Sequence, residues 1–351
     1  MPWVEWFHEL ASGRARGLRS GVQRGLLTAL SLPYSWAVRI RNRLYDLGWK
    51  ASHRAPVPVV SVGNLTLGGT GKTPCVEYVA AFYRRRGLRP AILSRGYGAS
   101  DGRNDEFLVL EENLPDVPHL QGTDRVQLAA VACEELESDI LILDDGFQHR
   151  RLARDLDIVV IDATNPWGFG RLFPRGLLRE PPAGLGRAHI IVLTRCNQAT
   201  RPSVEEVRRR IACLAPGRPV VQSVHLPEIL VNSERATRPI TDLIDRPVAA
   251  FAGIGNPEGF RRTLADLGAR LRAFRGFPDH HVYTRRDVED LRAWARQLPA
   301  DGLVLTTQKD LVKLQLNRLA ERELWALRIR LHLTWGQELL DRKLEEAVSG
   351  G

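Results

Sequence analysis

The run VVSVGNLTLGGTGKTP at residues 59–74 constrains the fold of this chain more than any other stretch. It begins as an apolar segment typical of a buried strand, passes through a glycine-rich turn, and enters a segment with the composition of a helix. Such a turn directs successive backbone N–H groups and the positive end of the helix dipole toward one point. The run therefore predicts a binding site for a polyphosphate.

Within this run, we expect Lys72 to reach the β- and γ-phosphates of a nucleotide and the Thr73 hydroxyl to bind Mg²⁺. The spacing departs from the strict G-x-x-x-x-G-K-[ST] form, because Thr66 occupies the position of the first glycine. A chance glycine turn is the alternative. The residues expected to contact the nucleotide are Thr66, Leu67, Gly68, Gly69, Thr70, Gly71, Lys72 and Thr73.

A second, acidic motif follows another apolar run, in the sequence DILILDDGFQH. Asp144 and Asp145 come directly after this predicted strand, so their carboxylates are expected at the same sheet edge as the glycine turn. Carboxylate oxygens are ligands that Mg²⁺ prefers, directly or through water. A pair of aspartates after a strand is often only a turn, but beside the glycine turn it predicts a magnesium site.

Strands and helices alternate along the rest of the chain, and the strands are apolar throughout instead of at every second position. This pattern is typical of a parallel sheet covered on both faces. The expected fold class is α/β: a P-loop NTPase-like parallel sheet domain, a second, smaller α/β domain, and an N-terminal amphipathic helical segment. The expected boundaries are 1–54 for the N-terminal segment, 55–231 for the nucleotide-binding domain, 232–247 for a linker and 248–351 for the smaller domain.

The N-terminal segment carries much of the positive charge. Residues 1–54 contain nine Lys or Arg and three Asp or Glu, which is +6 of the net +9. The segment also contains Trp3, Trp6, Trp36 and Trp49, and aromatic residues combined with arginine favour a membrane–water boundary. Residues 26–38 carry no charge, but a spanning helix needs about 20 residues and Pro33 interrupts the run. We expect the segment to lie on a bilayer; a basic helix packed on the protein's own surface and a nucleic-acid arm are the alternatives.

Four cysteines are spread along the chain without a C-x-x-C pair, which argues against a disulfide framework or a zinc site. We expect them to be buried as small apolar residues in a reducing compartment. No stretch resembles a cleavable signal peptide. We therefore expect the bulk of the protein to stay in the cytoplasm.

Five motifs occur in order along the chain: SVGNLTLGGTGKTP, SRGYG at residues 94–98, DDGFQHRRLARDLDIVVID, PRGLLREP at residues 174–181, and FPDHH at residues 277–281. In this order they resemble the tetraacyldisaccharide 4'-kinase family, from about residue 26 onward. The resemblance implies a two-domain, membrane-associated kinase of lipid A biosynthesis that uses MgATP. It also implies the cytoplasmic face of a bacterial inner membrane as the location, with the protein bound peripherally. It further implies that the acceptor is the 4'-hydroxyl of an acylated glucosamine disaccharide 1-phosphate.

The resemblance also assigns roles to residues. The family's phosphate-loop lysine and threonine fall on Lys72 and Thr73, and its catalytic aspartate falls on Asp105, although the neighbours of Asp105 differ from the family's Gly-Asp-Glu-Pro element. Its T-E-K-D run appears as TQKD at residues 307–310, where Gln308 lacks the charge. The other positions that match are the acids Asp144 and Asp145, the arginines Arg125 and Arg179, Glu180, which we include with the magnesium ligands, and the motif Asp279, His280 and His281.

For the chemistry, we expect Asp105 to accept the proton of the sugar hydroxyl. An isolated aspartate has a pKa near 3.9, low for this role, so a partner that orients it would help. We expect His280 to be that partner, brought from the second domain when a cleft closes over both substrates. Lys72, Arg125 and Arg179 are expected to neutralise charge on the phosphoryl group, although lone arginines more often lie on the surface.

Two other functions compete with a kinase. A P-loop GTPase or ATPase switch protein of the metal-insertion or targeting type has a similar turn, but its base-reading N-K-x-D motif is not found in the nearest stretch, residues 194–197. A nucleic-acid-binding protein is suggested only by the basic balance, and we expect no nucleic-acid partner. The remaining expectations are a monomer, a lipid substrate and the cofactors ATP and Mg²⁺.

Overall fold

The computed structural model describes residues 3–96 and 104–349, and the chain divides into two compact units. Unit 1 comprises Met1–Tyr97, Leu114–Val224 and Leu331–Gly351. Unit 2 comprises Gly98–Asn113 and His225–Arg330. Because the strands β7 (Val220–Val231) and β13 (Arg322–Trp335) each cross a boundary between these ranges, both contribute residues to both units.

Unit 1 is built on a parallel sheet in the strand order β7-β6-β5-β1-β4-β2-β3. Every neighbouring pair in it runs parallel, and the strands in its centre are buried along their whole length, which matches their continuous apolar sequence. The strands are β1 (Val59–Asn64), β2 (Pro90–Ser94), β3 (His119–Gln121), β4 (Ile140–Asp144), β5 (Leu156–Asp162), β6 (Ile190–Thr194) and β7 (Val220–Val231).

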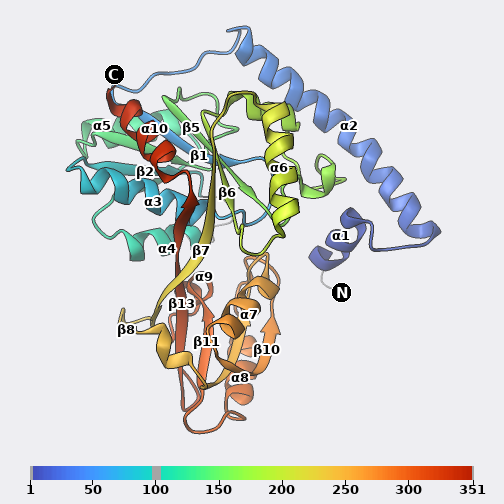
Figure 1. Ribbon diagram of the computed structural model, residues 1–351, viewed down its shortest axis with the longest axis vertical. Coiled ribbons are helices and arrows are strands. Elements are labelled where there is room, and N and C mark those ends of the chain that lie inside the picture. Colours follow the sequence, from blue (N-terminus) through green and yellow to red (C-terminus); the bar gives the residue numbers. More distant parts are fainter. Residues whose placement is uncertain (1–2, 97–103, 350–351) are drawn as a thin grey trace. The chain divides into compact units, whose positions relative to one another are not determined.

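Helices cover this sheet, and Figure 1 shows them alternating with the strands along the chain. One apolar cluster joins β5 and β6 to α6, and another joins β1, β2 and β4 to α5. The helical segments of unit 1 are α1 (Trp3–Ser12), α2 (Leu18–Asp46), α3 (Lys72–Arg85), α5 (Arg125–Glu134), η1 (Gly168–Gly170), η2 (Pro182–Arg187), α6 (Arg201–Leu214) and α10 (Gln337–Ser349).

Unit 2 contains a smaller sheet in the order β10-β9-β11-β13, again with parallel neighbours. Its strands β9 and β11 are fully buried between two apolar clusters. The elements of unit 2 are α4 (Asp105–Asn113), β8 (Thr237–Arg238), η3 (Ile240–Leu243), β9 (Pro247–Ala252), α7 (Pro257–Asp266), β10 (Arg270–Gly276), α8 (Arg285–Ala295), β11 (Leu303–Thr307), α9 (Gln308–Leu314), β12 (Arg318–Leu319) and β13 (Arg322–Trp335). The expected α/β fold class is confirmed.

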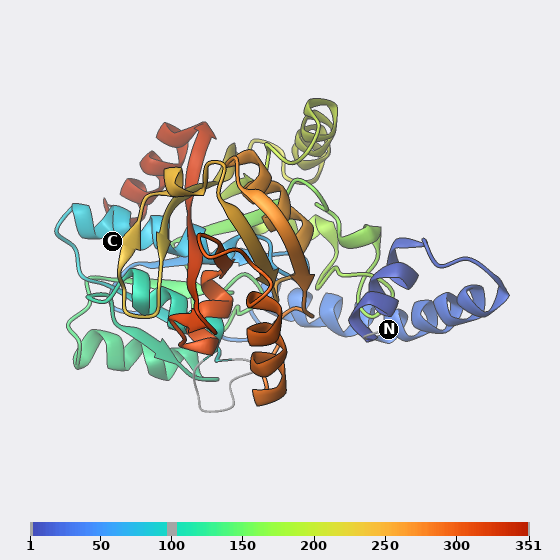
Figure 2. The same cartoon turned by 90° about the horizontal axis from the view of Figure 1, so that it is seen from below.

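The helix α2 runs without a break from Leu18 to Asp46 (Figure 1, Figure 2). Pro33 lies inside it, so the proline removes one backbone hydrogen bond but does not end the helix. One face of α2 is packed, with Ser35 and Val38 buried and Tyr34 and Asn42 half-buried, while large apolar side chains such as Leu26 are exposed. No helix in the described ranges is both long and apolar enough to cross a membrane.

Two expectations need correction. Only Cys75 is buried among the cysteines: Cys133 and Cys196 are half-buried, and Cys213 is exposed. Residues 232–247, expected as a linker, contain β8 and η3 and belong to unit 2. The contact division also places α4 in unit 2, although its sequence lies inside the expected range 55–231.

Candidate active site

The glycine turn between β1 and α3, residues 65–71, has the features of an anion site. We call it the phosphate loop. Gly71 precedes α3 with φ 90°, a left-handed conformation that suits glycine, and no side chain caps this helix. In the described part of the chain, the backbone N–H groups of residues 68–71 donate no hydrogen bond. Free amides at a helix N-terminus are what a phosphate requires, so the loop fits a polyphosphate.

The first half of the phosphate loop is held by the motif PRGLLREP. Thr66 forms an antiparallel bridge with Leu178, and the Leu67 amide donates to the Leu177 carbonyl at 2.7 Å. The position that holds glycine in the strict motif is therefore part of a short β-contact in this chain. Leu67 is among the residues expected to contact the nucleotide, but its N–H is already bonded to Leu177 and is not available to a phosphate.

The paired acids lie beside this loop. β4 runs parallel to β1, with Asp144 opposite Val62, and the two strands end at the same sheet edge. Gly63 allows this approach, because a Cβ at Gly63 would lie 2.5 Å from the Cβ of Phe147. Asp144 is buried, and Asp145 adopts the left-handed conformation with φ 55°.

Asp145 faces two cations. Its Oδ1 lies 3.6 Å from Lys72 Nζ and 2.6 Å from Arg179 Nη1. Burial alone would raise the pKa of Asp145, but the charges of Lys72 and Arg179 outweigh it and lower the pKa to about 2. The carboxylate is therefore ionised at neutral pH and has two cations as neighbours.

The donor set suits Mg²⁺ better than a transition metal. Thr73, Asp144 and Asp145 offer only oxygen atoms, which is the chemistry that Mg²⁺ prefers. No group of three or more His, Cys, Asp or Glu side chains able to hold a metal occurs among the residues described. In a kinase, one or two carboxylates usually hold Mg²⁺ together with the phosphates of the substrate.

Glu180, expected as a magnesium ligand, is instead enclosed by protein donors. Its side chain is completely buried, and its Oε1 accepts from Gln148 Nε2 at 2.8 Å. Its Oε2 accepts from Arg187 at 2.8 Å and from Asn42 of α2 at 3.0 Å. Because both oxygens already accept hydrogen bonds from protein donors, this carboxylate anchors α2 and the PRGLLREP segment, which does not support the expected role of Glu180 as a magnesium ligand.

Arg125 begins α5, which Asp124 caps by accepting from the Val126 amide at 3.0 Å. The guanidinium is buried, and its Nη1 lies 3.3 Å from His149 Nδ1. Burial, followed by the charge of Arg125, lowers the pKa of His149 to about 4. The imidazole is therefore neutral at pH 7 and accepts from Arg125. The charge of Arg125 also contributes to the lowered pKa of Asp145.

Asp105 and His280 form a contact within unit 2. Asp105 is the first residue of α4, and α4 packs against α9. The Nδ1 of His280 lies 2.9 Å from Asp105 Oδ2 and 3.1 Å from Oδ1. His280 has φ 56°, a conformation that is strained for a non-glycine residue and is often found at functional sites.

The two members of this dyad differ in exposure and pKa. The Asp105 side chain is 6% exposed and that of His280 is 58% exposed. Burial acts to raise the pKa of Asp105, but the His280 hydrogen bond and the Lys309 charge lower it to about 2. The hydrogen bond that His280 donates to Asp105 raises the pKa of His280 above its ordinary value.

Cations of α9 surround Asp105. Lys309 Nζ pairs with Glu106 at 2.7 Å, and Lys313 Nζ lies 3.8 Å from Asp105 Oδ2 and 3.1 Å from Asp310. Lys313 was not identified from the sequence, although its position four residues after Lys309 places both lysines on one helix face. The Gln308 amide donates to Glu112 at 3.0 Å, where a glutamate would be repelled.

The structure thus gathers the predicted residues in two places. Lys72, Thr73, Arg125, Arg179, Asp144 and Asp145 lie in unit 1, and Asp105 and His280 lie in unit 2. Asp105 and His280 are in contact within one unit of this structure, and the expectation that cleft closure brings them together stays a prediction. Tyr97 and Gly98 of the SRGYG motif lie outside the described residues.

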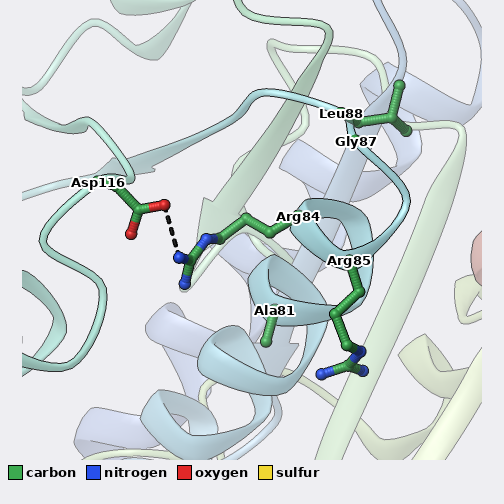
Figure 3. Close-up of a pocket in the computed structure, with 6 residues that line it drawn as sticks. All are labelled: Ala81, Arg84, Arg85, Gly87, Leu88 and Asp116. Carbon is green, nitrogen blue, oxygen red and sulfur yellow. Dashed lines mark ion pairs between the residues drawn. The ribbon is translucent and has the colours of Figure 1, made fainter.

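A pocket on unit 1 is unrelated to these sites. It lies at the C-terminal end of α3, whereas the phosphate loop is at the N-terminal end (Figure 3). Figure 3 shows Arg84 paired with Asp116, at 2.6 Å, and both side chains are exposed. None of the predicted site residues lines this pocket.

An uncapped glycine turn after a central strand of a parallel sheet, with acids at the end of the adjacent strand, defines the P-loop class of nucleotide-binding proteins. Comparison with known families refines this class. A family model described as Tetraacyldisaccharide-1-P 4'-kinase matches residues 23–349. The chain belongs to this family.

Curated relatives and a solved structure agree. A tetraacyldisaccharide 4'-kinase of Anaeromyxobacter sp. (strain Fw109-5) is 42% identical, over 99% of this chain and 96% of its own length. One from Geobacter metallireducens is 43% identical, over 82% of this chain and 88% of its own. The "apo" form of LpxK from Aquifex aeolicus in complex with ATP is 32% identical, with a TM-score of 0.74, over 93% of this chain and 99% of that one. The kinase interpretation is supported over that of a switch protein.

Proposed function

We propose that this protein transfers the γ-phosphate of ATP to the 4'-hydroxyl of a tetraacyldisaccharide 1-phosphate. Membership of the kinase family supports the donor and acceptor classes. The observation that carries the proposal is the Asp105–His280 dyad, because a switch ATPase needs no group that deprotonates a sugar hydroxyl. The phosphate loop belongs to unit 1 and the dyad to unit 2.

In the nucleotide site, the free amides of the phosphate loop and Lys72 bind the phosphates. Thr73, Asp144 and Asp145 are the residues that would hold Mg²⁺, which supplies neutralisation of the charge that develops on the phosphoryl oxygens. Lys72 exchanges its partner, Asp145, for the γ-phosphate when the nucleotide binds. Arg179 shares Asp145 with Lys72, so it is placed to neutralise the same charge.

In the dyad, His280 acts as the base and Asp105 orients it. Asp105 holds the proton on Nδ1, which leaves the lone pair of Nε2 to accept the proton of the acceptor hydroxyl as its oxygen bonds to phosphorus. This reverses the roles expected from the sequence. Asp105 is buried, has a pKa of about 2 and is already bonded through both oxygens, whereas His280 is exposed and has a raised pKa.

The N-terminal helices are proposed to bind the membrane that holds the lipid substrate. α2 exposes large apolar side chains to solvent, among them Leu26 at 62%, Leu30 at 59% and Trp36 at 69%. Interspersed arginines such as Arg39 and Arg43 favour an anionic surface. We propose a monomer, bound peripherally at the cytoplasmic face of the inner membrane, with no nucleic-acid partner.

The direct test is transfer of radiolabelled γ-phosphate to a tetraacyldisaccharide 1-phosphate in detergent, with a parallel reaction without acceptor that measures hydrolysis. We expect a labelled lipid that depends on both the acceptor and Mg²⁺. Release of inorganic phosphate at the same rate with and without acceptor, and no labelled lipid, would support the switch-protein alternative.

A further inference from the structure

Asn64 occupies a central place beneath the phosphate loop. It is the last residue of β1, and its side chain is completely buried. The Nδ2 amide donates to the Thr66 carbonyl at 2.8 Å and to the Thr70 hydroxyl at 2.9 Å. One side chain therefore joins the two halves of the phosphate loop from below.

The same side chain connects the loop to the charged residues of the site. Asn64 Oδ1 accepts from Arg179 Nη1 at 3.2 Å, and this nitrogen also donates to Asp145 at 2.6 Å. The backbone carbonyl of Asn64 accepts from Gln148 at 2.8 Å. A displacement of Asn64 would therefore move both the loop and the arginine that pairs with Asp145.

Thr194 holds the loop from a second direction. It ends β6, which is separated from β1 by β5, and it is completely buried. Its hydroxyl donates to the Thr70 carbonyl at 2.7 Å. The hydroxyl of Thr70 is therefore held by Asn64 and its carbonyl by Thr194, so this residue is fixed at both of its polar groups.

These bonds leave the amides of residues 68–71 as the open donors of the loop. Donors that are fixed before the reaction stabilise a developing charge without a cost of reorganisation. We propose that Asn64 and Thr194 are positioning residues for phosphoryl transfer. Without touching the nucleotide, they hold the phosphate loop in place, and Asn64 also fixes the position of Arg179 relative to the loop. The proposal rests on the proposed function for its kinetic test.

The chemistry at each position is specific. An asparagine supplies two donors and one acceptor, and all three are used at Asn64, whereas an aspartate would supply no donor to Thr66 or Thr70. A valine at position 194 has nearly the shape of threonine but would leave the buried Thr70 carbonyl without its donor. A serine keeps the hydroxyl.

The test compares Thr194→Val, Thr194→Ser and Asn64→Asp in the full-length enzyme, at a temperature where circular dichroism shows each variant folded. Ser223→Ala is the matched control, because the buried Ser223 hydroxyl donates to the Leu193 carbonyl at 2.9 Å and makes no contact with the phosphate loop. The readouts are kcat and KM for ATP, and the equilibrium affinity for ATP.

We expect Thr194→Val to lose about 10-fold in kcat/KM, the order that a lost buried hydrogen bond gives. Thr194→Ser should recover to within about threefold, and Ser223→Ala should match the wild type. Asn64→Asp should lose about 10²-fold in kcat/KM, mostly through kcat, because small displacements of catalytic groups slow the chemical step. The loss of kcat/KM in the double variant Asn64→Asp/Thr194→Val should be smaller than the product of the two single losses, because both residues hold Thr70.

Wild-type kinetics in Thr194→Val, or equal losses in Thr194→Val and Ser223→Ala, would overturn the proposal. If the wild type labels no lipid, the proposed function fails but this proposal does not. The affinity for ATP then decides. A loss of affinity in Thr194→Val that Thr194→Ser restores would support the positioning role, and unchanged affinities in all variants would reject it.

Discussion

At the residue scale, two aspartates reach a pKa of about 2 by different routes. Asp145 is 34% exposed and is shared by Lys72 and Arg179, so its partners can be exchanged when a nucleotide arrives. Asp105 is nearly inaccessible and is held by His280 and the lysines of α9. The first suits a residue that releases a lysine and binds a metal, and the second suits a residue that orients a base.

Lys72→Ala should lower transfer by about 10²- to 10³-fold or more, because it removes the charge nearest the β- and γ-phosphates as the transition state forms. The measurement is labelled lipid formed per minute at saturating acceptor. Lys343→Ala is the matched control, since Lys343 is an α10 surface residue paired with Glu346. Equal activity of the two variants would contradict the phosphate-loop assignment.

His280→Ala and Asp105→Ala should each lower kcat by about 10²- to 10⁴-fold, the range for a lost general base, with little change in ATP affinity. If the two residues act as one unit, the double variant should be only slightly worse than the worse single variant. Fully multiplicative losses would assign them independent roles. A loss of ATP affinity in Asp105→Ala would instead make Asp105 part of the magnesium site.

At the element scale, the two faces of α2 differ. Its exposed face carries apolar side chains and arginines, while its packed face bonds to the PRGLLREP segment: Tyr34 donates to the Arg179 carbonyl at 2.8 Å, and Asn42 donates to Glu180. The helix is therefore fixed to unit 1 at the segment that carries Arg179. The sequence pattern predicted a basic aromatic helix here but not these contacts.

Leu26→Ser, Leu30→Ser and Trp36→Ser combined should reduce sedimentation with anionic vesicles by at least about 10-fold, because each leucine contributes up to about 1.5–3 kcal/mol when buried. Arg39→Glu with Arg43→Glu should also release the protein, with a loss of about 1 kcal/mol for each basic contact, and high salt should mimic this effect. Ile244→Ser, an exposed apolar position in unit 2, is the control. If neither the serine nor the glutamate substitutions change vesicle binding, α2 is not the surface that contacts the membrane.

At the scale of the whole molecule, the dyad belongs to unit 2 alone, which leads to a prediction about pH. In the enzyme without substrates, NMR titration should give His280 a pKa above 6.5, because the Asp105 bond outweighs burial. The contribution of this contact to the free energy of unfolding should be fully present below pH 6.5 and should be lost as the pH rises through the raised pKa of His280. Asp105→Asn should lower the His280 pKa. A raised pKa that is found only when both substrates are present would show that closure assembles the dyad.

The sequence by itself determined the α/β class, the strand–turn–helix of the phosphate loop and the acids after β4. These features are local: apolar runs make buried strands, glycines permit the turn, and the end of a strand sets which edge its acids occupy. Motif matches also brought Asp105 and His280 together as partners, although their sequence separation is large.

Only the tertiary structure decided which groups are free to act. It placed α4 with α9 in unit 2, so Asp105 is buried beside Lys309 and Lys313, which supports the proposal that it orients His280. It enclosed Glu180, and it showed Asn64 and Thr194 beneath the loop. A sequence pattern gives the chemical types of these side chains, but burial and hydrogen-bond partners depend on segments that are distant along the chain, and these fix protonation and role.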